Sequence, residues 1–274
     1  MSQAVKEQTQ PYDFGADPVR VNIHLPNDPR PNKFTHRLRK PTLEQWLVWG
    51  HELYEERRNL SPEEIEEGNK LRDADDLVSW AYEKKFNEYD PSRRLYEAIA
   101  IDVTDYKLDE SGELQPAETH PLTPKLLNRA ILNKDVVISS LYKSYCELEE
   151  SSGAEDTEEV RVRQTIGVSE TPPSVLHALR KATDEERQKF QNESLRTYAV
   201  ADNPDTIRIC VNLRIADDLY NEMLLRVENA TVNGQSFDEA SHVTFLKEIN
   251  PVFKFKVLEA ALQIKLMNFD HDLR

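Results

Sequence analysis

The chain has 274 residues, 38% of them apolar and 31% Asp, Glu, Lys or Arg, and its net charge is −15. This length suffices for one large domain or two ordinary ones, and the low apolar share favours a very soluble folded protein with some disordered stretches. The acidic balance argues against a general nucleic-acid binder, which needs clustered Lys and Arg.

Nothing in the sequence predicts contact with a membrane. No apolar run approaches the length of a membrane span, and the N-terminal MSQAVKEQTQ lacks the apolar core of a signal peptide. We therefore expect a cytoplasmic protein, or one inside a particle assembled in the cytoplasm. Cys146 and Cys210 both lie in apolar patterns, so we expect buried free thiols, with a disulfide between the two halves as the alternative.

The first part of the chain predicts a flexible tail, residues 1–17, followed by a β-hairpin. VRVNIHL, Val19–Leu25, alternates as a half-buried strand does, PNDPRPN is a turn, and KFTHRLRK, Lys33–Lys40, alternates again. Pro41 and Thr42 then open a helix. Ser61 and Glu64 form a capping box that starts further helix, which we interpret as an insertion over about 59–91.

The middle of the chain predicts a linker. Residues 149–174 begin with an acidic stretch that is poor in apolar residues, so we expect this segment to be mobile. The following SVLHALRKATDEERQKFQNESL predicts a helix from Ser174, with a restart at Thr183, which caps the Asp-Glu-Glu after it.

The second half repeats the pattern of the first. RTYAV and TIRICVNLR predict another hairpin, and IADDLYNEM predicts a helix. Three pairs of residues agree between the halves: Leu95 with Leu219, Val103 with Val227, and Gly112 with Gly234. The sequence thus predicts an α+β fold of two diverged hairpin-plus-helix repeats, 18–148 and 175–274, in a pseudo-twofold arrangement. The alternative is a chance likeness between two common units.

Catalytic and cofactor signatures are absent from the sequence. The 7 glycines are isolated, so neither a phosphate-binding loop nor a dinucleotide fingerprint exists, and there is no Gly-x-Ser-x-Gly elbow or cysteine pair with zinc spacing. We therefore predict no catalytic residue and no cofactor.

Two sets of polar residues are weak site candidates. His51 and Glu55, one helical turn apart, could supply two metal ligands, but the sequence offers no third and fourth ligand, so it favours a solvated charged turn. His120 and His242 hold similar places in the two halves and could form a ligand-binding pair, or serve at loop-to-helix junctions.

Paired acidic residues and the three tryptophans have simpler interpretations. Asp75-Asp76 and Asp217-Asp218 point about 100° apart on a helix, so they do not form a catalytic pair, and we expect Asp217 and Asp218 to serve at a helix N-terminus. The core is expected to contain all the tryptophans, Trp46, Trp49 and Trp80.

The C-terminal helix, Val252–Met267, has more apolar surface than one buried stripe requires. Part of that surface must meet either the other repeat or a second molecule. The candidate interface residues are Phe255, Leu258, Leu262 and Leu266.

These features favour a non-enzymatic protein-interaction protein: an adaptor, an assembly factor or a structural subunit of a larger complex. Its partner would be another protein or a second copy of the chain. The segment FTHRLRKPTLEQW and the acidic helical middle resemble phage tail-assembly chaperones and other phage accessory proteins, over less than a tenth of the chain. That resemblance implies an assembly role.

Two alternatives remain open. The first is an enzyme or metal-binding protein whose site is assembled from scattered residues, namely His51, Glu55, His120 and Asp102. The second is an acidic nucleic-acid mimic whose carboxylates occupy the groove of a basic partner.

Overall fold

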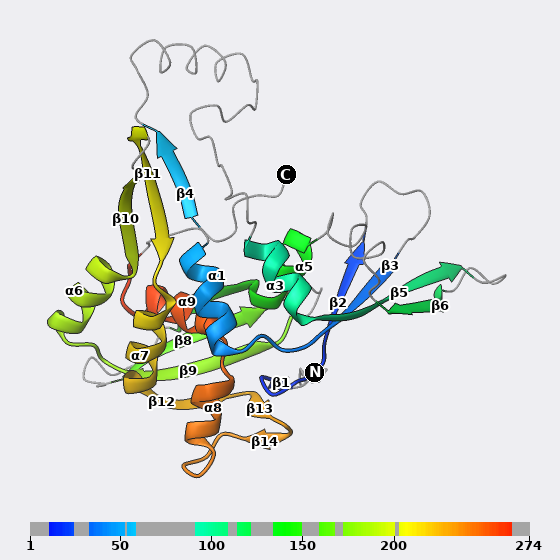
Figure 1. Cartoon of the computed structure of the whole chain (residues 1–274). Helices are drawn as coiled ribbons and strands as arrows, with labels where there is room; N and C mark the ends of the chain where they lie inside the picture. The colour runs from blue at the N-terminus through cyan, green and yellow to red at the C-terminus, as the bar shows by residue number, and fades with distance from the viewer. Residues whose placement is uncertain are drawn as a thin grey trace, which may run out of the picture.

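The fold is α+β, as the sequence predicts. The structure is a computed structural model, and it describes residues 11–24, 33–52, 54–58, 91–108, 114–121, 134–149, 159–167, 172–200 and 203–264. Within these ranges two four-stranded sheets, two three-stranded sheets and the helices between them share one hydrophobic core (Figure 1). No helix in the described ranges is long and apolar enough to cross a membrane.

The first four-stranded sheet contains the hairpin expected near the N-terminus, and that prediction is confirmed. Its strands, in spatial order, are β2 (Val19–His24), β3 (Lys33–Leu38), β5 (Ala100–Leu108) and β6 (Leu114–Pro121). Two helices, α3 (Pro91–Ile99) and α5 (Lys134–Tyr142), pack against each other, and α5 also contacts β2. Val21, His36 and Val103 are buried in this sheet.

The second four-stranded sheet is formed by β12 (Leu224–Glu228), β9 (Ser174–Arg180), β8 (Glu159–Ile166) and β7 (Ser144–Leu148), in that order. Helix α9 (Pro251–Ala261) packs on β7 and β8, and α7 (Leu213–Met223) packs on α9 and β9.

Two expectations are wrong in this part of the chain. Ser174–Arg180 is a strand, not the start of a helix, and β8 lies inside the range 149–174 assigned to a mobile linker. The reason is burial: Val175–Leu179 is buried on both faces of the sheet, which removes the alternation that identifies a strand in sequence. Residues 150–158, the acidic part of the expected linker, lie outside the described residues.

The two sheets share their hydrogen-bonding registers. Val19 pairs with Leu38 in the first sheet, and Val160, 141 residues further along, pairs with Leu179. The next strand of each sheet agrees as well: His36 lies opposite Val103, and His177 lies opposite Val227.

The same two sheets also share an irregularity. A register shift falls between Arg37 and Leu38 in β3, and the corresponding shift in the second sheet falls where β9 passes from Ala178 to Leu179. One extra residue in one strand of a pair bends and twists that strand locally, so both sheets depart from regularity at corresponding places.

Helices α1 (Leu43–Glu52) and α6 (Asp184–Glu193) follow the corresponding strands β3 and β9. Each begins after a threonine whose hydroxyl accepts from the backbone three residues on, Thr42 from Gln45 N at 3.2 Å and Thr183 from Glu186 N at 3.2 Å. The Gln45 and Glu186 side chains accept in return from the threonine N–H, which completes two capping boxes. The helix start predicted at Thr183 is thus confirmed.

The hairpin expected in the second half is present, but in a different sheet. Its strands β10 (Leu195–Val200) and β11 (Asn203–Val211) pair with each other, and β11 pairs with β4 (Tyr54–Arg58). This third sheet lies at the upper left of Figure 1, apart from the other two. The hairpin whose register agrees with that of β2–β3 is β8–β9, not β10–β11.

Part of the expected N-terminal tail belongs to the core. β1 (Tyr12–Asp13) pairs with β13 (Ala230–Val232), which also pairs with β14 (Gln235–Ser236), and α8 (His242–Glu248) follows. The Phe14 ring is buried with its centroid 6.3 Å from that of Phe253 on α9. Burying a phenylalanine side chain stabilises the folded state by about 1.5–3 kcal/mol. The burial of Phe14 therefore explains why the chain next to β1 is held against the core.

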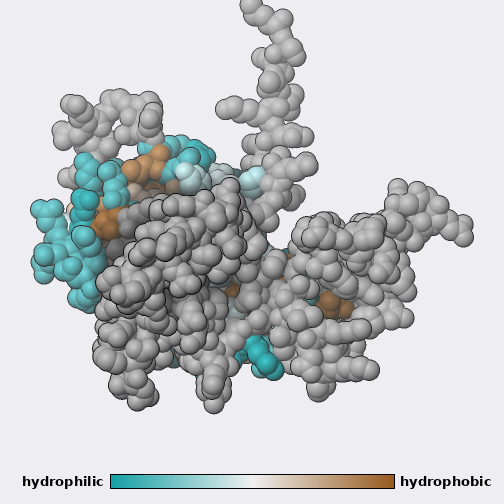
Figure 2. All heavy atoms as spheres, turned by 90° about the horizontal axis from the view of Figure 1, so that it is seen from above, coloured by the Kyte–Doolittle hydropathy of each residue, from teal (hydrophilic) through white to brown (hydrophobic). Residues whose placement is uncertain are grey.

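Helix α6 gives one side of the molecule a hydrophilic surface, because nearly all of its residues are polar or charged. Figure 2 shows hydrophilic residues gathered at the side where α6 lies, with a few hydrophobic atoms beside them. In α6 only Phe190 is buried, and its ring lies 5.5 Å from that of Phe255 on α9. One buried side chain thus attaches an otherwise solvent-facing helix to the core.

Candidate functional site

The candidate site is the outer face and the free edge of the second sheet, β12-β9-β8-β7. Alternation along β8 places Val162 and Gln164 under the sheet, where both are fully buried. Glu159, Arg161 and Arg163 point to the other side and meet charged residues of the neighbouring strands. The strand order thus brings together charges that are far apart in sequence.

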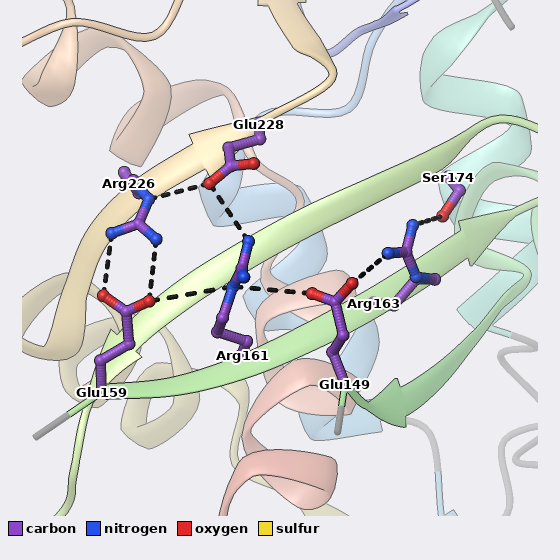
Figure 3. A network of polar contacts seen from close by, with 7 residues as sticks. All are labelled: Glu149, Glu159, Arg161, Arg163, Ser174, Arg226 and Glu228. Atoms are coloured by element: carbon purple, nitrogen blue, oxygen red, sulfur yellow. Dashed lines mark hydrogen bonds and ion pairs between the residues drawn. The ribbon is translucent and has the colours of Figure 1, made fainter. Parts of the chain in front are cut away.

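These outer-face charges form one connected network (Figure 3). Arg226 of β12 makes two hydrogen bonds of 2.8 Å to the carboxylate of Glu159, and its Nε donates to Glu228 at 2.9 Å. Arg161 lies between three carboxylates, with its nearest distances 3.5 Å to Glu228 and 3.6 Å to Glu149. The hydrogen bonds from Arg226 hold the pKa of Glu159 below its ordinary value.

The network neutralises itself. Its six charged residues are three arginines and three glutamates: Arg161, Arg163, Arg226, Glu149, Glu159 and Glu228. A hollow of about 380 Å³ lies over it. Since each of these three arginines already has a carboxylate partner, the network does not offer a free cation to an anionic ligand. Exposed pairs of this kind contribute about 0–1 kcal/mol each to stability, although several in one network can do more.

Strand β7 ends the sheet, and no described strand pairs with its outer edge. Glu149 N donates to Arg161 O and Gly167 N donates to Lys143 O, both at 2.8 Å. Because antiparallel neighbours alternate in the direction of their backbone groups, the odd-numbered residues of β7 bond to β8, and Ser144, Cys146 and Leu148 direct their N–H and C=O groups outward. Lys256 of α9 donates to the Ser144 carbonyl at 3.1 Å.

Two apolar side chains of β7 are exposed. Tyr145 is 64% exposed and lies on the outer face, whereas Leu148 is 40% exposed on the α9 side. Cys146, between them, is half-buried and free, and burial raises the pKa of its thiol to about 12. An open edge with exposed apolar side chains is a template for pairing with another strand.

A buried hydrogen-bonded chain lies beneath the sheet. Gln164 Nε2 donates to Ser144 Oγ at 3.0 Å, so its Oε1 accepts from His177 Nε2 at 3.0 Å. His177 Nδ1 then accepts from the Tyr220 hydroxyl at 2.6 Å. Burial lowers the pKa of His177 to about 3 and raises that of Tyr220, so both groups are neutral. This closed arrangement suits a structural role, because every member has a partner.

The first sheet contains the same pair. His36 Nδ1 accepts from the Tyr96 hydroxyl at 2.8 Å, and burial lowers the pKa of His36 to about 4. Neither His36 nor His177 is among the site residues that the sequence predicts. A repeated sequence motif could have identified them: His-x-Leu-Arg-Lys-x-Thr occurs at 36–42 and again at 177–183.

Asp217 has a different role from the one expected. It is buried on α7 and forms an ion pair of 2.6 Å with Lys254 of α9, which also donates to Asn221 at 2.8 Å. Burial lowers the pKa of Lys254, and the Asp217 charge opposes that shift. Asp217 therefore satisfies a buried cation instead of capping a helix. Asp75, Asp76 and Trp80 lie outside the described residues, whereas Trp46 and Trp49 belong to the core as predicted.

The metal candidates do not share a helix. α1 ends at Glu52, and Glu55 belongs to β4, where it lies opposite Ile209 of β11. The turn-to-turn spacing of His51 and Glu55 is therefore lost. His51 is exposed and lines a cleft of about 400 Å³ between α1 and the start of α7. Within the described ranges, no group of three His, Cys, Asp or Glu side chains is close enough to hold a metal.

The paired histidines occupy unlike elements. His120 is in β6, opposite Val103, whereas His242 is the first residue of α8, with its ring 5.5 Å from that of Phe237. The expected correspondence between them is therefore wrong. Asp102, the fourth candidate for a scattered site, pairs with Arg37 across β3 and β5.

The C-terminal helix is enclosed by the chain itself. Phe255 and Leu258 are fully buried and Leu262 is 5% exposed, because α9 lies between α7 and the strands β7 and β8. These three side chains meet the interior, which was the intramolecular alternative, and they offer no surface to a partner. Leu266 lies outside the described residues. Cys210 is buried and forms no disulfide, as expected.

Comparison with known proteins assigns no family. No family model matches the chain, and neither the curated proteins nor the solved structures contain a match. Function is therefore inferred from the geometry of the sheet and its edge.

Proposed function

We propose that this chain is a non-enzymatic protein-interaction protein, an adaptor, assembly factor or structural subunit of a larger complex. The observation that carries the proposal is the outer edge of β7, which no strand in the described ranges pairs with and where Tyr145 and Leu148 are exposed beside outward-directed backbone groups. A sheet edge gives affinity through main-chain hydrogen bonds and specificity through flanking side chains. A phage-like particle and a cytoplasmic location belong to the same proposal, and the sequence alone supports them.

The chemistry of the polar groups supports a binding role. The buried histidines His36 and His177 bond to tyrosines inside the core, and Lys254 bonds to Asp217. Catalytic groups, in contrast, face a cleft where a substrate can reach them. Of the residues in the enzyme or metal-site alternative, His51 lines a cleft, whereas Glu55 belongs to β4 and Asp102 pairs with Arg37.

The acidic-mimic alternative has little support on the candidate face. Glu149, Glu159 and Glu228 are all paired with arginines there, so these carboxylates do not form an uncompensated row like that of a phosphate backbone. A different, unneutralised surface would be needed for this role.

We also propose that the two sheets are diverged copies of one unit, in the pseudo-twofold arrangement expected from the sequence. The support is the agreement of registers and of element order: β2, β3, α1 and β4 correspond to β8, β9, α6 and β10, and 95–104 corresponds to 219–228. Leu95 and Leu219 both lie in a helix that leads directly into a strand of the sheet, and so do Tyr96 and Tyr220. Gly112 lies outside the described residues.

The test of the interaction role uses the chain in its own cells. Native fractionation should place the tagged protein in a species larger than one chain, and Leu148→Pro should release it. Leu225→Ala is the matched control, because Leu225 is similarly exposed, at 48%, but lies on β12 at the opposite side of the sheet. A wild-type protein that migrates as one chain, and that melts at higher temperature with a metal or metabolite, would favour the enzyme alternative.

A further inference from the structure

We infer that β7 pairs antiparallel with β7 of a second copy of this chain, which joins two four-stranded sheets into one continuous sheet across a twofold axis. This inference rests on the proposed function and names its partner. It follows from the direction of the backbone groups of β7, from the length of its regular edge and from the charges that flank it.

The regular edge of β7 distinguishes it from the other end of the sheet. Its pairing with β8 runs from Ser144 to Leu148 without a register shift. At the opposite end, β12 has a shift between Leu224 and Arg226. Such irregularities turn an edge away from regular pairing, whereas an uninterrupted edge remains a template.

Only one register uses the whole of β7. Ser144, Cys146 and Leu148 direct their backbone groups outward, so these three residues must bond to the same three residues of the other copy. Full overlap places Cys146 opposite Cys146, and Ser144 opposite Leu148 of the second copy. Shifting the pairing by two residues in either direction loses part of the ladder. Ser144 is 6% exposed and its oxygen already accepts from Lys256, so the bond from Leu148 of the second copy uses the remaining lone pair of that oxygen.

This register brings opposite charges together on the outer face. Lys143 lies opposite Glu149 of the second copy, and Tyr145 lies opposite Glu147, with each pair repeated by symmetry. Lys143, Tyr145 and Glu147 are exposed, and the Tyr145 hydroxyl is hydrogen-bonded to Glu147 of its own strand, so in the dimer this bond can be exchanged for the one to the second copy. Opposed unlike charges stabilise neighbouring strands, and a shift by two residues would place Glu147 opposite Glu147 in one direction and Tyr145 opposite Tyr145 in the other.

The expected association is weak. An edge of five residues buries less area than the roughly 800 Å² per partner of a standard interface, so we expect a concentration-dependent dimer with a Kd of about 1–100 µM. Such a contact suits a subunit that assembles reversibly.

Sedimentation equilibrium of the purified full chain tests the inference. The wild type should dimerise, and Leu148→Pro should weaken the dimer at least about tenfold, because proline removes an outward N–H without affecting the bonds to β8. Leu148→Ala keeps that N–H and should stay within about threefold of the wild type. A wild type that is monomeric up to about 1 mM, or a Leu148→Pro protein that dimerises normally, would overturn the inference.

A second pair of variants keeps the test decisive if the proline protein does not fold. Lys143→Glu should weaken the dimer about three- to tenfold, because it opposes Glu149 of the other copy, and Lys143→Ala should have a smaller effect. Register is tested by oxidising a mixture of Tyr145→Cys and Glu147→Cys proteins. Both proteins also carry Cys146→Ala, because Cys146 lies opposite its own copy in this register and could cross-link by itself. The mixture should then give a cross-linked dimer that neither protein gives alone, and cross-linking of either protein alone contradicts the register.

Failure of this inference is distinguishable from failure of the proposed function. If the purified chain stays monomeric but the protein in its own cells migrates in a larger species that Leu148→Pro releases, the edge binds a different protein and the second-copy inference is wrong. If neither species exists, both proposals fail.

Discussion

His36 and His177 are both buried, and each accepts a hydrogen bond at Nδ1 from a tyrosine hydroxyl, at 2.8 Å from Tyr96 and at 2.6 Å from Tyr220. Each histidine also lies opposite a buried valine of the next strand. The helix that supplies the tyrosine leads directly into that strand in both sheets. In each sheet, the histidine–tyrosine hydrogen bond therefore holds the junction between that helix and that strand in place.

These histidines should make stability depend on pH. Their folded pKa values, about 4 for His36 and about 3 for His177, lie below the ordinary value of 6.5. The unfolded chain thus binds more protons, so the stabilisation is fully present above pH 6.5 and is lost as the pH falls below it. Each histidine should lower the free energy of unfolding by about 1.4 kcal/mol per pH unit in that range.

Urea unfolding at about pH 7.5, 6 and 5 checks this dependence. His177→Gln should reduce the slope to that of one histidine. Glu186, whose pKa is held at about 2 chiefly by its hydrogen bond from Arg180, loses its contribution only as the pH falls below about 4.5, so it does not confuse this range. A stability that is flat between pH 6.5 and 5 would show that the histidines are not buried as described.

Removing one tyrosine hydroxyl should destabilise either sheet similarly. Tyr220→Phe leaves His177 Nδ1 buried without a donor, which costs about 1–3 kcal/mol, and Tyr96→Phe should do the same to His36. Because the two pairs lie in different sheets, the costs should add in the double variant to within about 0.5 kcal/mol. Chemical denaturation gives all the values, and an unchanged midpoint for either single variant would contradict the hydrogen bond assigned to it.

The buried ion pair predicts a larger effect. Asp217→Ala leaves the ammonium of Lys254 buried with only uncharged acceptors, and breaking such a pair costs about 3–5 kcal/mol. Replacing both partners, as in Asp217→Leu with Lys254→Met, should cost less than Asp217→Ala alone. Thermal and urea unfolding measure both proteins. If the single variant is as stable as the wild type, Lys254 reaches water and the assigned burial is wrong.

Several features of the fold could be predicted from the sequence because they depend on local chemistry. The β2–β3 hairpin is predicted by the alternation of apolar and polar residues on both sides of a Pro-rich turn. The start of α6 is predicted by the capping box of Thr183. The tryptophans Trp46 and Trp49 are core residues simply because of their size and spacing.

Other features could not be predicted because they depend on distant partners. Val175–Leu179 is apolar without alternation, so only its neighbours in space make it a strand. Helix α9 contains Lys254 and Lys256, and neither would be expected inside a core without partners that come from α7 and β7. The sequence shows that α9 has an excess of apolar residues. It does not show that other parts of the same chain cover them.

The candidate edge was hidden for a similar reason. β7 (SYCEL) is short and adjoins the acidic stretch, so nothing in its composition distinguishes it from the end of a helix. Its role as an edge depends on the strand order β12-β9-β8-β7, which no local pattern contains.

Residue-resolved hydrogen exchange tests the central claim, that the free edge of β7 is the binding surface, most directly. In the dilute chain the amides of Cys146 and Leu148 should exchange fast, because they point outward, whereas those of Tyr145 and Glu147 bond to β8 and should be protected. Raising the concentration, or adding a partner from the cell, should protect Cys146 and Leu148 and leave Tyr145 and Glu147 unchanged. If association protects another surface while Cys146 and Leu148 continue to exchange fast, the account is wrong.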